Sequence, residues 1–168
     1  MTKDFLLRLT EEHYGAGAFP IYGRLLEEQR LTRGGSLLPM WYCTAALRRA
    51  FGGENVLVLG CTNDSLLAHL LGATPVNPLP PHYHCPNCHR LIFDAHADDG
   101  WDLPDLACPE CGTSMAAEGH NLRSRSLIGE SVVPLQVPQE QFAPVCAWLR
   151  DYWAQRDCQP DTEPYSDT

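Results

Sequence analysis

Hydrophobic residues recur at three- and four-residue steps through the first fifty positions, and this spacing predicts helices. The steps run through Phe5, Leu6 and Leu9, and then through Tyr22, Leu25 and Leu26, with the polar Gln29 at the next step. Breaks at 15–19 and 32–39 separate these two helices from a third one at 40–51, which Gly52 and Gly53 are expected to end. The N-terminal part is therefore predicted to be helical.

The pattern changes after this third helix. Residues 55–60 are apolar and rich in β-branched side chains, which predicts a short buried strand, and a polar turn leads from it into a helix at 64–71. An extended connector follows, because each proline fixes its own φ and disfavours helix at the residue before it. These prolines are Pro75, Pro78, Pro80 and Pro81. Two more strands are expected at 122–128 and 132–137.

The last apolar pattern predicts a helix at 139–156. Its hydrophobic face contains Phe142, Val145, Leu149, Tyr152 and Trp153. These aromatic residues and Trp148 form either a docking surface or packing that closes the hydrophobic core. Core packing is the favoured interpretation. Residues 159–168 combine acidic residues with prolines and small polar residues, and we expect them to be disordered.

Two Cys-x-x-Cys pairs carry the strongest chemical signal in the chain. Cys85 and Cys88 form the first pair, and Cys108 and Cys111 follow after nineteen intervening residues. Each pair can wrap a tight turn around half of a tetrahedron, so four thiolates predict one zinc ion, with rubredoxin-type iron as the alternative. Because cysteine fills all four positions, none stays open for water or substrate, and a structural ion is expected.

Other candidate ligands give weaker signals. Cys43 and Cys146 are expected to be small buried hydrophobic residues. Several histidines near the pairs suggest a second metal, but histidines bonded to the backbone in turns and caps are the preferred interpretation. They are His82, His84, His89 and His120. An acidic stretch between the pairs lacks the alternation of a calcium loop, so a solvated loop is expected. It contains Asp94, Asp98, Asp99, Asp102 and Asp105.

Composition limits the classes of protein that fit. With 168 residues and 44% hydrophobic content, the chain suits one domain with a core plus a small metal-stapled subdomain. A net charge of −9 with 12 basic residues argues against tight nucleic-acid binding, which needs a dense Lys/Arg patch. The cysteine spacing, the lack of a leader segment and the absence of a long apolar run favour a protein of the reducing cytoplasm, with no membrane anchor.

Together these patterns predict an α+β fold, in which a small, helix-rich α/β layer carries an inserted four-cysteine zinc-ribbon subdomain and a C-terminal helix. We expect a helical and α/β N-terminal part at 1–75 and a ribbon module at 76–129. A strand and a C-terminal helix that pack on the core follow at 130–158, and the tail occupies 159–168.

The ribbon module resembles a known family. It opens with Val76-Asn77-Pro78-Leu79-Pro80-Pro81-His82-Tyr83, and it contains Gly100-Trp101-Asp102-Leu103-Pro104-Asp105 and then Gly119-His120. In order and spacing, these motifs and the cysteine pairs resemble the zinc-binding segment, close to the palm, of the PolC-type DNA polymerase III alpha subunit. The likeness is dense from Val76 to Gly129 and weaker back to Leu47.

The resemblance implies two catalytic elements that flank the zinc segment. The family's triphosphate loop carries an arginine and several serines, whereas the stretch from Leu59 to Ser65 has no arginine and contains Asp64, which would repel phosphate. The family's two magnesium-binding aspartates correspond to Leu135 and Val137. Two-metal phosphoryl transfer needs those carboxylates, so we expect this chain not to be an enzyme.

The expected function is therefore that of a pseudoenzyme. It would be a zinc protein derived from PolC that acts through protein contacts in DNA replication or repair, for which an acidic surface is suited. One alternative is a nucleic-acid-binding accessory factor that uses Arg90, Arg123 and Arg125. Another is a small subunit of a different complex that reuses the zinc scaffold. Half of a split polymerase and an enzyme of another class are less favoured, because the residues for their chemistry are missing.

Overall fold

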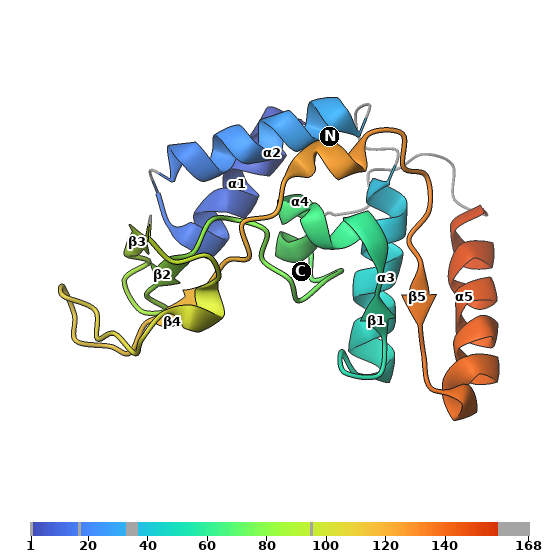
Figure 1. Cartoon of the computed structure of the whole chain (residues 1–168). Helices are drawn as coiled ribbons and strands as arrows, with labels where there is room; N and C mark the ends of the chain where they lie inside the picture. The colour runs from blue at the N-terminus through green and yellow to red at the C-terminus, as the bar shows by residue number, and fades with distance from the viewer. Residues whose placement is uncertain (1, 17, 33–36, 95, 158–168) are drawn as a thin grey trace.

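The computed structural model describes residues 2–16, 18–32, 37–94 and 96–157. Its α-helices are α1 (Lys3–Tyr14), α2 (Phe19–Leu31), α3 (Leu38–Phe51), α4 (Leu66–Leu70) and α5 (Phe142–Asp157). Its strands are β1 (Leu57–Val58), β2 (His82–His84), β3 (Leu91–Phe93), β4 (Ala116–Glu118) and β5 (Leu135–Gln136). The strands form two antiparallel sheets, ordered β1-β5 and β3-β2-β4 (Figure 1). The predicted α+β class is confirmed, and the predicted tail at 159–168 lies outside the described residues.

A capping side chain and two glycines mark ends of the N-terminal helices. The Thr2 side chain accepts a hydrogen bond from the Phe5 amide and so caps the start of α1. Gly15 follows α1 with φ +78° and Gly52 follows α3 with φ +89°, a backbone region that favours glycine. The buried faces of α1, α2 and α3 supply Leu6, Leu25 and Trp41 to the main core, together with residues of α4. The three predicted helices are confirmed.

The predicted buried strand at 55–60 is wrong in length and in burial. Only Leu57 and Val58 form β1, and they pair with β5 alone. Val56 and Val58 are buried, whereas Leu57 and Leu59 are 48% and 44% exposed. A two-stranded sheet that is covered on one face buries only alternate residues, so a continuous apolar run overstated the burial here.

The predicted strand at 122–128 is also wrong. This segment contains a 3-10 turn, η3 (Ser124–Leu127). The Leu122 carbonyl accepts a hydrogen bond from Arg24 of α2 at 3.1 Å, and the Leu122 amide donates to the Pro78 carbonyl at 3.0 Å. These bonds leave the backbone of Leu122 without a ladder partner. The second predicted strand, at 132–137, is confirmed only for the two residues of β5.

The observed helices that flank these strands differ from the predicted ones by a few residues at their ends. The helix expected at 64–71 is reduced to α4 and is preceded by a 3-10 turn, η1 (Gly60–Asp64). The C-terminal helix expected at 139–156 begins at Phe142 after another 3-10 turn. Val145 of its predicted apolar face is buried, but Phe142 is 58% exposed. Trp148 packs edge-on against Phe51 of α3, which favours the interpretation that α5 closes the core.

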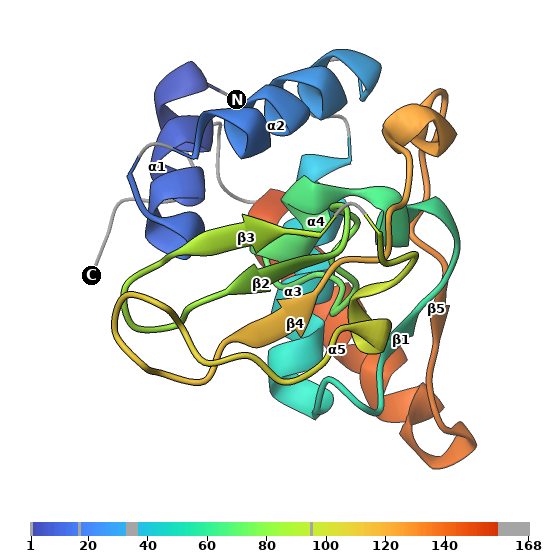
Figure 2. The same ribbon diagram turned by 60° about the vertical axis from the view of Figure 1, so that its left-hand side comes forward.

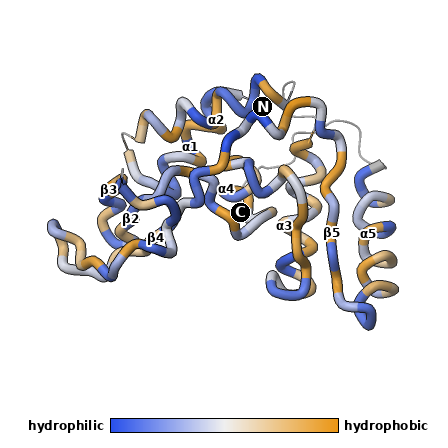
Figure 3. The backbone as a smooth tube through the Cα atoms, in the orientation of Figure 1, coloured by the Kyte–Doolittle hydropathy of each residue, from blue (hydrophilic) through white to orange (hydrophobic). Residues whose placement is uncertain are grey.

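The structure places the ribbon module on one side and the β1-β5 sheet on the other. Figure 1 shows α4 between them, with α1 and α2 above. Turned by 60°, the molecule shows the β3-β2-β4 sheet in front of α3 and α5 (Figure 2). Hydrophobic positions recur along α3, β5 and α5, which run side by side (Figure 3). These elements share a small apolar cluster centred on Leu47, Val56 and Val145.

Polar groups at the centre of the molecule join the ribbon module to α1. The Asn77 amide nitrogen donates to the Tyr14 hydroxyl at 3.0 Å and to the Glu118 carboxylate at 2.7 Å. His82 is fully buried next to the Tyr14 ring, and its Nδ1 donates to the Pro80 carbonyl at 2.8 Å. The hydrogen bond from Asn77 to Tyr14 therefore adds a specific polar contact between the module and α1, and the other two bonds fix Asn77 and His82 within the module.

Acid should lower the stability of the folded chain through His69 of α4. Burial lowers the pKa of His69 below its ordinary value of 6.5, so the folded chain binds fewer protons there than the unfolded chain. The His69 contribution to stability is then complete above about pH 6.5 and falls as the pH drops towards the folded pKa. Urea unfolding of His69→Gln between pH 7 and pH 5 should show a weaker pH dependence than the parent. His96→Gln, at an exposed position, is the matched control for loss of an imidazole.

Candidate metal centre

The β3-β2-β4 sheet brings the two cysteine pairs together. β2 pairs with β3 and with β4. The first cysteine pair lies in the turn from β2 to β3, and the second lies in a turn closed by the Ala107–Ser114 bridge shortly before β4. The two turns share one hydrogen-bond pattern. The His89 amide donates to the Cys85 carbonyl at 3.0 Å, and the Gly112 amide donates to the Cys108 carbonyl at 2.8 Å. Both turns therefore present their thiols in the same way, as the spacing predicted.

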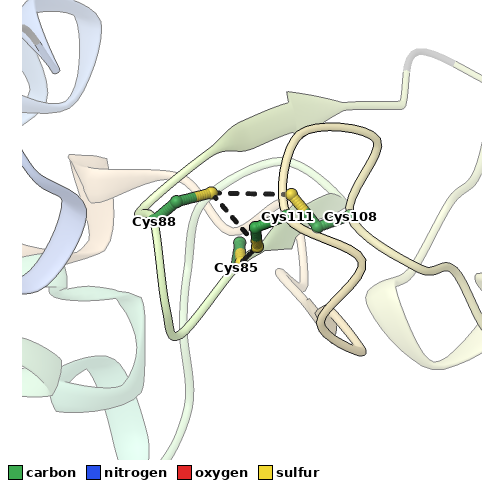
Figure 4. A group of neighbouring side chains, drawn as sticks. All are labelled: Cys85, Cys88, Cys108 and Cys111. Atoms are coloured by element: carbon green, nitrogen blue, oxygen red, sulfur yellow. Dashed lines mark hydrogen bonds between the residues drawn. The ribbon is translucent and has the colours of Figure 1, made fainter.

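The four thiols form one compact cluster (Figure 4). Cys85 Sγ lies 3.5 Å from Cys111 Sγ, Cys88 Sγ lies 3.5 Å from Cys108 Sγ, and the Sγ atoms of Cys88 and Cys111 are 3.7 Å apart. All four sulfur atoms lie within 4.8 Å of one another. A tetrahedral ion with metal–sulfur bonds of about 2.3 Å requires sulfur atoms about 3.8 Å apart. The spacing of the thiols is compatible with a tetrahedral metal ion.

The two halves of the cluster differ in burial. Cys85 and Cys108 are buried among apolar side chains of the module, which include Tyr83, Leu103 and Met115. Cys88 and Cys111 are exposed. The metal centre is thus part of the small core of the module on one side and faces solvent on the other. This position suits a structural ion that ties two loops together.

Thr113 contacts Cys111 of the cysteine cluster. The Thr113 Oγ1 atom lies 3.4 Å from Cys111 Sγ. Hydrogen bonding from the Thr113 side chain is the largest of the effects that lower the pKa of Cys111 to about 5. A hydrogen bond to the thiolate favours the form that binds metal.

Thr113→Val should therefore weaken metal binding. Valine keeps the shape of the side chain and removes the hydroxyl, so the affinity should fall by about tenfold, which is typical for loss of a group that bonds to a ligand. Competition with a chromophoric chelator measures the affinity. Ser114→Ala, an exposed neighbour, should retain the parent value. Equal affinity of the parent and Thr113→Val would contradict this role for Thr113.

His89 occupies a position that suits glycine. Its φ is +58°, which corresponds to the +73° of Gly112 in the second turn. The imidazole packs against Gly15, where an added Cβ would lie 2.8 Å from His89 Cβ, and its Nδ1 lies 3.3 Å from the His13 carbonyl oxygen. The contact with the end of α1 accounts for a side chain at this strained position.

The remaining candidate ligands do not join the cluster. Among the described residues, only the four cysteines form a group that can hold a metal ion. His82 and His89 bond to backbone carbonyls, and His120 Nδ1 lies 2.9 Å from the Asp99 carboxylate. Cys43 is buried, which raises the pKa of its thiol to about 11, and Cys146 is half-buried. The acidic stretch lies in the loops between β3 and the second cysteine pair.

The three arginines proposed for nucleic-acid contact lie in two places, with Arg90 beside β3 and the other two at η3. Arg90 directly precedes β3 and pairs with Glu110 at 3.0 Å across the two cysteine turns. Arg123 and Arg125 are exposed at η3, which packs against α2 and η1. No described helix is long and apolar enough to cross a membrane.

Comparison with known proteins shows the family to which this chain is related. The chain is 37% identical over 132 residues to the DNA polymerase III PolC-type of Latilactobacillus sakei and 31% identical over 131 residues to that of Ureaplasma parvum, and each match covers 76% of this chain. A match of 44% identity over 72 residues links it to the same polymerase of Bacillus subtilis. This chain is a relative of PolC-type DNA polymerase III.

The likeness to PolC covers only part of the relatives. The longer matches span 9% of the relative's length, and the match to the Bacillus subtilis protein spans 5%. No protein-family profile matches the chain. The resemblance inferred from the cysteine segment is confirmed, and the activity of a whole PolC polymerase does not transfer to this chain by similarity alone.

Leu135 and Val137, where the resemblance implied two catalytic aspartates, lie against an apolar cluster. Leu135 of β5 and Val137 are half-buried and pack against the cluster formed by Leu47 of α3, Val56 and Val145 of α5. Gln136 between them is exposed. The face of β5 that carries Leu135 and Val137 is thus covered by hydrophobic side chains from α3 and α5.

A buried glutamate that the sequence pattern did not indicate lies at the start of α4, next to the stretch 59–65 for which the resemblance implied a triphosphate loop. Glu28 of α2 is fully buried and accepts hydrogen bonds from the Leu66 amide at 2.9 Å, the Leu67 amide at 3.1 Å and the Ser65 hydroxyl at 3.0 Å. Arg24 donates to the same carboxylate at 2.7 Å. The four-residue step from Arg24 to Glu28 was the available signal, but such pairs are common on exposed helix faces.

Proposed function

We propose that this chain is a non-catalytic zinc protein, derived from the palm-adjacent segment of a PolC-type polymerase, that acts through protein contacts in DNA replication or repair. Homology to PolC supports the replication context. The packing of Leu135 and Val137 carries the non-catalytic part of the proposal. Two apolar side chains that contact a hydrophobic cluster offer no oxygen ligand to Mg²⁺, which prefers carboxylates.

The environment of α4 supports the same proposal. A polymerase must bind the triphosphate of its incoming nucleotide, and the amides that start a helix are suited to phosphate. Here the Glu28 carboxylate already accepts hydrogen bonds from the amides of Leu66 and Leu67. A phosphate at this place would have to displace a buried carboxylate and would be repelled by its charge.

Zinc is the ion that we assign to the cysteine cluster. Four thiolates in tetrahedral geometry suit zinc and also a single iron. Zinc needs no redox partner and is common in closed sites that join two loops. Elemental analysis of the purified chain should give about one zinc per chain and no visible absorption band, whereas a coloured, iron-containing protein would contradict the assignment.

Restoring the aspartates should not restore polymerase activity. Leu135→Asp with Val137→Asp buries two carboxylates in an apolar cluster, so we expect lower stability and no primer extension with Mg²⁺ and nucleotides. The parent chain should be inactive in the same assay, which includes an active polymerase as a positive control. Thermal melting records the loss of stability, and Gln136→Asp is the matched control, because its exposed carboxylate should leave melting unchanged.

Primer extension by the purified parent would overturn the non-catalytic part of the proposal. The protein-contact part is tested separately by affinity purification of the metal-loaded full chain from its host. Replication or repair proteins should be recovered with it and should be lost from a sample that carries Cys85→Ser. Recovery of ribosomal or metabolic proteins alone would contradict the replication context.

A further inference from the structure

The negative charge of the chain is concentrated in one segment of the ribbon module. Residues 91–122 contain seven of the 21 acidic residues and none of the 12 basic residues, and Arg90, just before this segment, pairs with Glu110 and offsets one of these charges. Four thiolates around a divalent ion would add a further −2 at the same module. Its field attracts cations and repels nucleic acid.

Trp101 projects from this segment. It lies in a 3-10 turn, η2 (Gly100–Asp102), and is 84% exposed. Asp98, Asp102 and Asp105 lie within four residues of it and are also exposed. A large indole ring so exposed is uncommon, and rigid aromatic side chains are frequent anchors of protein interfaces.

The turn that carries Trp101 is held firmly by the module. The Asp99 carboxylate accepts a hydrogen bond from the Trp101 amide at 2.9 Å, and Gly100 lies so close to Glu118 that an added Cβ would approach its carbonyl carbon to 2.3 Å. The Gly100 amide donates to the Gly119 carbonyl at 2.6 Å. The exposed ring is therefore attached to a backbone fixed against β4, which reduces the entropy lost on binding.

His120 supports one edge of the indole. Its ring lies edge-on to Trp101 with centroids 5.1 Å apart, and its Nδ1 is 2.9 Å from the Asp99 carboxylate. Asp99 thus contacts both the turn and the histidine. The support leaves most of the Trp101 surface open to solvent and places carboxylates beside it in the sequence.

We infer that Trp101, together with Asp98, Asp102 and Asp105, forms the docking surface for an arginine- or lysine-rich segment of a partner protein. The cation of such a segment stacks on the indole face, and its other basic side chains pair with the carboxylates. The charge of the segment argues for this occupant and against nucleic acid. The inference rests on the proposed function and names the surface through which its protein contacts would be made.

Fluorescence anisotropy tests the surface directly. The probe is a short labelled peptide rich in arginine and glycine, and the matched probe has glutamine in place of arginine. The metal-loaded full chain should bind only the arginine peptide. Trp101→Ala should weaken this binding about three- to fivefold, the effect of one exposed cation–π contact. Asp98→Asn with Asp102→Asn and Asp105→Asn should weaken it further and flatten its dependence on salt.

A charge-matched control separates docking from general attraction. Glu11→Gln, Glu12→Gln and Glu27→Gln remove the same charge from exposed positions on α1 and α2 and should change the affinity by less than about twofold. Equal weakening by this control and by the aspartate triple variant would overturn the inference. So would unchanged binding by Trp101→Ala, or binding of duplex DNA that depends on Trp101. Metal content and melting temperature show that each variant is folded.

Affinity purification with Trp101→Ala distinguishes the two proposals. If replication proteins are recovered equally with this variant, the proposed function stands and the surface is wrong. If binding of the arginine peptide depends on Trp101 but no replication or repair protein is recovered with the parent, the surface stands and the replication context is contradicted.

Discussion

Cys85→Ser should unfold the ribbon module, and we expect this to be the largest effect of any single substitution. The module has a small core, and two of the side chains in that core are Cys85 and Cys108 of the cysteine cluster. Metal binding to four thiolates stabilises a site of this type by an amount on the order of 10 kcal/mol. No comparable contribution is available from strands that are three residues long.

Hydrogen exchange locates the unfolding. Amides of β2, β3 and β4 should lose protection in Cys85→Ser and in parent protein treated with a chelator, whereas α2 and α3 should retain more of theirs. Cys43→Ala is the control, because Cys43 is a buried cysteine outside the cluster. It should bind metal like the parent. Full protection of the strands after removal of the metal would show that the site does not maintain the fold.

Glu28→Gln should lower the free energy of unfolding by about 3 kcal/mol, the low end of the cost of breaking a buried ion pair by removing one partner. The Glu28 carboxylate accepts hydrogen bonds from the amides of Leu66 and Leu67 and from the Arg24 guanidinium. Glutamine has one acceptor oxygen and a donor group that would face other donors. Arg24, whose side chain is only 18% exposed, would lose its charged partner.

Urea denaturation of metal-loaded protein measures this loss. Glu27→Gln removes the same charge from the adjacent exposed position and should change stability by less than about 0.5 kcal/mol. If Glu28→Gln is as stable as Glu27→Gln, the carboxylate is not required to cap α4. Measurable binding of a nucleoside triphosphate by Glu28→Gln alone would show that Glu28 keeps phosphate from the start of α4.

The clustering of the four cysteines is the part of the candidate site that the sequence predicted best. Two Cys-x-x-Cys pairs specify their own turns, because the hydrogen bonds within each turn join residues only four positions apart. Only the meeting of the two turns depends on tertiary structure, and the β3-β2-β4 sheet provides it. The same locality explains why the N-terminal helices and their glycine ends were predicted correctly.

The strands outside the module were predicted less well. The apolar run at 55–60 could not reveal that β1 has one partner and one covered face. The segment at 122–128 is held by Arg24, which lies 98 positions before Leu122, and no local pattern reports such a bond. The pairing of Glu28 with the start of α4 was missed for the same reason.

By itself, the sequence determined the four-cysteine cluster, the helices of the N-terminal part and the relationship to PolC, because each depends on short-range spacing or on motifs in a fixed order. Tertiary structure alone decided that Leu135 and Val137 lie against α3 and α5 and that a buried glutamate caps α4. It also decided that Trp101 is exposed to solvent on a turn whose backbone is fixed against β4. These features join residues far apart in the chain, so their energies appear only once the chain is folded.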